Sequence, residues 1–111
     1  MKKTDKKIDN AIRRVLTDVC EAVLTRQDGF KWLTHLVDYD NFPKSLHIIC
    51  VYDFNDDLAR ADKEDIYFRI KSALAKIDIQ IKDIYQHVSF DTEENCDKDN
   101  NGKWSERLRT H

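Results

Sequence analysis

The sequence predicts an α+β protein: an α-β-β-α-β sandwich with two helices on one face of a three-stranded, mainly antiparallel sheet. Three observations predict this class. Residues 8–23 and 66–77 each carry an apolar stripe with helical spacing. Residues 48–52 are an unbroken apolar run, typical of a strand covered on both faces. We expect one domain over residues 1–94 and a polar tail over 95–111 with a short C-terminal helix.

The first helix is expected near residues 6–26, with residues 2–7 frayed. Thr4 or Asp5 is the candidate N-cap, and Asp28-Gly29 the candidate stop, because glycine accepts the left-handed conformation that closes helices. The stripe that predicts this helix consists of Ile8, Ile12, Val15, Leu16, Val19 and Val23.

A hairpin follows. Residues 30–39 are rich in aromatic and β-branched side chains and predict the first strand. Residues 40–43 (DNFP) have turn composition, and residues 45–54 predict the second, central strand.

The second helix is preceded by a solvated acidic loop over residues 53–65, with Asp62 as its N-cap. The third strand has two interpretations. Either residues 77–81 and 84–90 both belong to it, with a bulge near Lys82-Asp83, or residues 77–81 are a connector and the strand begins near Ile84. Trp104 is expected to dock the tail, and the second face of the sheet is covered by that tail or by a second copy of the chain.

Three short stretches resemble a known family. They are the turn at residues 27–29 (QDG), the apolar strand at 46–51, and residues 90–93 (FDTE). With the layout from Ile8 to Glu94, they resemble ribosome-binding factor A, a small assembly factor with a type II KH-like fold. The resemblance implies RNA or a ribosomal subunit as partner. The chain departs from the family in its net charge of −2, in lacking a GxxG loop, and in showing no glycine-built kink between two consecutive helices near residues 59–75.

A basic cluster at the start of the chain is the candidate nucleic-acid site: Lys6, Lys7, Arg13 and Arg14. Lysine and arginine neutralise phosphates and release counterions, so such a cluster binds a backbone without reading sequence. Strand aromatics could add stacking faces, the alternative being that they are core: Phe30, Trp32, Tyr52, Phe54 and Tyr85.

Residues 97–102 (DKDNNG) fit the opening of a calcium loop, with Asp97, Asp99 and Asn101 as ligands. The twelfth position holds Leu108 where a bidentate glutamate is required, so calcium binding would be weak. The alternative is a flexible acidic loop. His35, His47 and His87 fall one on each predicted strand and would form a zinc site only if they faced the same way; hydrogen-bonded sheet histidines are the alternative.

Nothing in the sequence indicates catalysis. Cys20 and Cys50 lie on apolar patterns typical of inert core thiols, and Cys96 is expected to be exposed without a neighbouring base. No glycine-rich phosphate loop is present, and no apolar run approaches the ~20 residues that span a bilayer. We therefore expect a cytoplasmic, non-enzymatic binding domain without a cofactor. The first hypothesis is weak RNA association in ribosome assembly, and the alternative is a homodimer formed through the sheet.

Overall fold

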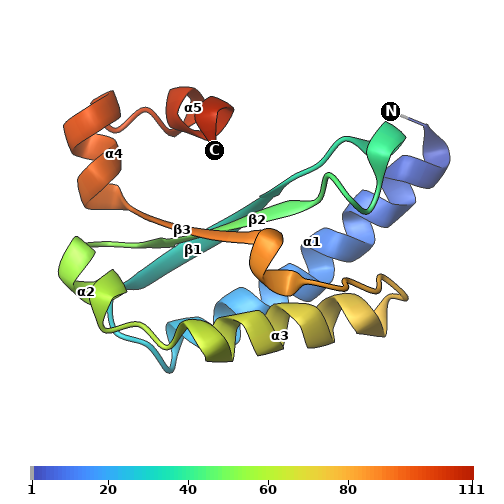
Figure 1. The fold of residues 1–111 in the computed structure, drawn as a ribbon, viewed down its shortest axis with the longest axis horizontal. Coiled ribbons are helices and arrows are strands. Elements are labelled where there is room, and N and C mark those ends of the chain that lie inside the picture. Colours follow the sequence, from blue (N-terminus) through green and yellow to red (C-terminus); the bar gives the residue numbers. More distant parts are fainter. Residues whose placement is uncertain (1) are drawn as a thin grey trace.

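A computed structural model of the chain describes residues 2–111 and has the predicted α+β class (Figure 1). Its helices are α1 (Lys3–Leu24), α2 (Asn55–Ala59), α3 (Lys63–Lys76), α4 (Glu93–Asn100) and α5 (Trp104–Arg107). Its strands are β1 (Phe30–Leu36), β2 (His47–Tyr52) and β3 (Val88–Thr92). Short 3-10 turns lie at Tyr39–Asn41, Ile84–Gln86 and Leu108–Thr110. None of the helices within residues 2–111 is long and apolar enough to cross a membrane.

The sheet has the order β1-β2-β3, so β2 is central as predicted. The hairpin pairs β1 with β2 in antiparallel fashion, from Phe30 opposite Tyr52 to Leu36 opposite His47. β3 pairs with β2 in parallel fashion, which makes the sheet mixed. The reason is the crossover through α2 and α3, which returns the chain to the end of the sheet where β2 began.

The two faces of the sheet are covered by different parts of the chain. α1 and α3 pack on one face, and residues 93–111, here called the C-terminal segment, lie on the other (Figure 1). Alternate residues of β2 face the helices α1 and α3 on one side and the C-terminal segment on the other. All five residues from Ile48 to Tyr52 are fully buried. The apolar run therefore belongs to a strand covered on both faces, as predicted.

Several local predictions were wrong. α1 begins at Lys3, and its N-cap is Lys2 without a side-chain hydrogen bond, so neither Thr4 nor Asp5 caps it. The acidic stretch contains α2, and Asp62 caps α3 by accepting from the Asp65 N–H at 3.0 Å, as predicted. Residues 77–81 form no strand, so the connector interpretation of this segment is the correct one. Ile79 and Ile81 alternate because they bury against the core, and β3 begins only at Val88.

The turn between α1 and β1 is held against α2. Gly29 has a φ of 79°, and a side chain there would place its Cβ 2.2 Å from a carbon of Asp57. Glycine is therefore required both by the backbone conformation and by the close approach of α2.

Candidate functional site

The predicted basic residues lie together on the solvent side of α1. At 3.6 residues per turn, Lys6, Lys7, Arg13 and Arg14 fall within about 120° of arc, opposite the buried stripe. All four are exposed. This set is called the basic face below. The structure brings its members onto one surface of one helix, an arrangement able to follow a phosphate backbone but without any group that reads bases.

Arg13 differs from the other three because it has an ion-pair partner. Its Nε lies 3.0 Å from Asp9 Oδ2, while its side chain remains 71% exposed. Asp9 is buried and also accepts from Tyr39 Oη at 2.7 Å and bonds His35 Nε2 at 2.9 Å. The Tyr39 hydrogen bond is the largest cause that lowers the pKa of Asp9, with His35 and Arg13 adding to it against burial. The carboxylate therefore stays charged and holds Arg13 in place.

The Asp9 cluster lies at an open groove of about 730 Å³ between α1 and β1, here called the edge groove. Burial and the neighbouring carboxylate raise the pKa of Tyr39, so its hydroxyl remains a donor near neutral pH. Sequence reasoning missed this site. The only signals were an aspartate beside the apolar stripe of the helix and a histidine within a strand. Neither signal indicates that the two side chains contact each other.

The predicted stacking aromatics divide between core and surface. Phe30 and Tyr52 are buried and meet edge to face with ring centroids 5.4 Å apart. Trp32 packs against Trp104 at 4.8 Å. Phe54 and Tyr85 are more than half exposed. The core alternative thus describes Phe30 and Tyr52, and Trp104 docks the C-terminal segment as expected.

The calcium-loop residues lie at the end of α4. Asp97 and Asp99 are helical and Asn101 follows in the left-handed conformation, so the three side chains do not start from the extended loop that the motif requires. Asp99 Oδ2 lies 3.3 Å from Arg107 Nη1. Within residues 2–111, no group of three or more His, Cys, Asp or Glu side chains is arranged to hold a metal ion.

The three sheet histidines have separate partners. His35 lies on the helix-covered face with Asp9, His47 Nε2 lies 2.6 Å from Ser89 Oγ, and His87 Nδ1 lies 2.6 Å from the Leu46 carbonyl oxygen. Burial lowers the pKa of His47, and electrostatic repulsion between it and the neighbouring His111 and His87 lowers that pKa further. The hydrogen-bonded alternative therefore describes these residues.

The cysteines are poor nucleophiles in this fold. Cys96, expected to be exposed, is fully buried because its helix packs on the sheet. Burial raises the pKa of all three thiols, that of Cys50 to about 12. A thiol with a raised pKa carries little thiolate near neutral pH.

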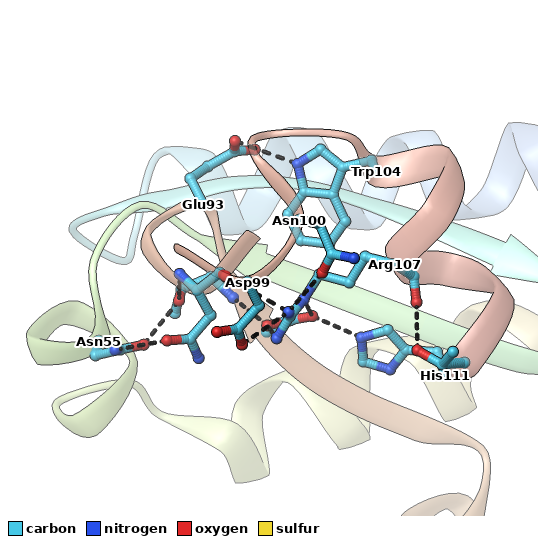
Figure 2. A network of polar contacts seen from close by, with 11 residues as sticks. Asn55, Glu93, Asp99, Asn100, Trp104, Arg107 and His111 are labelled. Atoms are coloured by element: carbon cyan, nitrogen blue, oxygen red, sulfur yellow. Dashed lines mark hydrogen bonds and ion pairs between the residues drawn. The ribbon is translucent and has the colours of Figure 1, made fainter. Parts of the chain in front are cut away.

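A second buried aspartate organises the C-terminal segment (Figure 2). Arg107 donates to both oxygens of Asp91, at 2.6 and 2.9 Å, and His111 Nε2 lies 2.6 Å from Asp91 Oδ2. Figure 2 shows Arg107 also directed at Asp99 and Asn100. Burial would raise the pKa of Asp91, but the hydrogen bonds from Arg107 and His111 outweigh it and lower that pKa. This network was not predicted.

The second face of the sheet is thus occupied by the chain itself. Glu93 accepts from Trp32 Nε1 at 2.7 Å and from Trp104 Nε1 at 3.2 Å, which joins the sheet to the start of the C-terminal segment and to the start of α5. A homodimer through this face would have to displace the segment.

Comparison with protein-family models, with curated proteins and with solved structures finds no match for this chain.

Proposed function

We propose that this chain is a non-catalytic module that binds RNA weakly and mainly electrostatically through the basic face of α1. The observation that carries the proposal is the exposure of four cationic side chains on one arc of a regular helix. Each of these side chains can reach a phosphate without breaking any contact in the core. Because the whole chain carries a net charge of −2, the attraction is local to this face.

The four cations contribute unequally. Arg13 is partly neutralised by Asp9, whereas Lys6, Lys7 and Arg14 have no ion-pair partner within residues 2–111. These three therefore carry most of the attraction, and Arg13 contributes a guanidinium held in a fixed position. A fixed, planar donor suits phosphate better than a mobile one.

The layout supports the ribosome-assembly part of the proposal. Two consecutive helices, α2 and α3, lie between β2 and β3. The resembled family has a helix pair at this place, and α2 was hidden in the sequence by its acidic composition. RNA is therefore the partner class to test first, and a ribosomal subunit follows if RNA binds.

The test is a binding titration against mixed-sequence single-stranded RNA at several salt concentrations. Replacing Lys6, Lys7, Arg13 and Arg14 by glutamine should weaken binding and reduce the slope of log K against log salt by about 3, since each phosphate contact on a single strand contributes about 0.7. The matched control replaces four exposed lysines elsewhere, Lys71, Lys76, Lys82 and Lys98, with the same change in net charge.

An unchanged slope in the basic-face variant would contradict the proposal. An equal loss in the control would also contradict it, because the attraction would then belong to the charge of the whole chain. Circular dichroism of both variants checks that α1 is intact.

A further inference from the structure

The edge groove runs beside an unpaired strand edge. β1 has only β2 as a neighbour, so one of its edges has no strand partner within residues 2–111. Five consecutive residues, 33–37, line the groove opposite α1. A lining by consecutive residues means that the backbone itself, and not only alternate side chains, faces the opening.

The direction of the backbone groups follows from one contact. The main-chain N–H of Ile48 donates to the His87 carbonyl oxygen at 2.7 Å, on the β3 side, so Ile48 does not hydrogen-bond to His35, its partner on β1. In an antiparallel pair, the N–H and C=O groups of alternate residues point to the same side. His35 and Leu33, two positions before it, therefore direct their backbone groups away from β2 and toward the groove, whereas Thr34 and Leu36 direct theirs at β2.

Charges of opposite sign stand at two points of the groove. The Nη groups of Arg13 and the carboxylate of Glu21 have no partner within residues 2–111, and both side chains are exposed. The two residues are eight positions apart on α1, or about 12 Å at 1.5 Å per residue. In an extended strand, four positions span about 13 Å, so side chains four positions apart match this spacing.

We propose that the edge groove binds an extended segment of another protein, which adds to the sheet as a strand beside β1. The segment carries an acidic side chain at Arg13 and a basic one four positions away at Glu21. Main-chain hydrogen bonds to Leu33 and His35 supply affinity, and the two charges select the segment.

Charge complementarity favours another protein over a second copy of β1. The only charged residue within Phe30–Leu36 is Lys31, so a copy of this strand brings no acidic group to Arg13. This inference is independent of the RNA proposal, since only Arg13 belongs to both surfaces.

The probe is the peptide acetyl-TVEVTVKVT-amide, titrated into the full chain and followed by two-dimensional amide NMR. Saturable shifts should fall on residues 33–37 and on α1 near Arg13 and Glu21. The bound state should also protect the amides of Leu33 and His35 from hydrogen exchange. The same peptide with glutamine at both charged positions should bind at least about fivefold more weakly.

Two variants locate the site without altering a charge. Thr17 is exposed and lines the groove, so Thr17→Trp should fill it and weaken peptide binding by about tenfold or more. Thr4→Trp places the same bulk on the same helix outside the groove and should leave binding unchanged.

Absence of saturable binding, or shifts confined to other elements, would overturn the proposal. Equal affinity in Thr17→Trp and the unchanged chain would do the same. A mass that rises with concentration and returns to that of the monomer in Thr17→Trp would assign the groove to a second copy, and so overturn the heterologous partner.

Discussion

The two faces of the sheet each contain one buried aspartate, and the two are used differently. Asp9, under the helix-covered face, pairs with an arginine four residues away that is mostly exposed. Asp91, under the C-terminal segment, pairs with Arg107 sixteen residues away through two hydrogen bonds, and the Arg107 side chain is only 17% exposed. Both acids also contact a histidine.

The difference follows from what else holds each face together. Behind Asp9 lies an apolar core that joins α1 and α3 to the sheet. The Asp9–Arg13 ion pair therefore adds little to the stability of an interface that apolar packing already holds together. The C-terminal segment is polar, and its buried anchors are few, chiefly Cys96 and the Trp104 ring against Trp32. Polar contacts therefore carry a larger share of its attachment, and they are specific in geometry.

The largest expected effect is that of Asp91→Asn. The substitution leaves Arg107 in a largely buried position without its bidentate partner, so the free energy of unfolding should fall by about 3 kcal/mol. Chemical denaturation measures this, and tryptophan fluorescence reports whether Trp104 leaves Trp32. Asp97→Asn, exposed on α4, is the control. A loss for Asp91→Asn below that of Asp9→Asn would reverse the comparison drawn here.

A smaller effect is expected from acid. The pKa values of Asp9 and Asp91 are both lowered in the folded protein, so the unfolded state binds more protons as pH falls below about 4. The stability that each carboxylate contributes is therefore complete above pH 4 and is lost as pH falls through the folded pKa. Asp91→Asn should reduce the slope of the free energy of unfolding against pH below about pH 4, and Asp9→Asn should reduce that slope less. If the slope is unchanged in both variants, other titrating groups produce the loss of stability in acid.

The smallest expected effect is that of calcium. If Asp97, Asp99 and Asn101 bind it, the end of α4 must rearrange and Asp99 must leave Arg107, so only a slight rise in melting temperature is expected at millimolar calcium. Asp97→Ala should abolish the rise, and magnesium should not reproduce it. A melting temperature independent of calcium would show that these residues do not bind calcium.

The elements that pack by apolar periodicity could be predicted from the sequence. The stripes of α1 and α3 and the doubly buried β2 have no competing interpretation, because only one arrangement buries them. The parallel pairing of β3 was not predicted, since Val88 and Phe90 alternate in the same way for either direction. α2 and α4 were missed because their residues are acidic and polar, and their ends are fixed by contacts with distant residues, such as Asn55 with Asn95.

The basic face could be predicted because its residues are close in sequence and helical spacing places them together. The Asp9 and Asp91 clusters could not, since each joins segments 16 to 30 residues apart. Asp9 is a lone aspartate in a helix, and Arg107 and His111 form a short Arg-x-x-x-His stretch far from Asp91. No local pattern indicates which residues these side chains pair with. The predicted central position of β2 already leaves β1 at an edge, but the groove beside it could not be predicted, because it depends on how α1 packs along that edge through distant contacts such as Asp9 with Tyr39.

The order of the layers along the chain has a consequence for biosynthesis. All three strands precede residues 93–111, so on the ribosome Trp32, Ile49 and Val51 are synthesised before the segment that covers them. At 5–20 residues per second, the interval is about 1 to 4 s. A chain that ended at residue 92 would leave this apolar face of the sheet uncovered and so prone to aggregation. The polar C-terminal segment thus acts as a cap that ends this exposure.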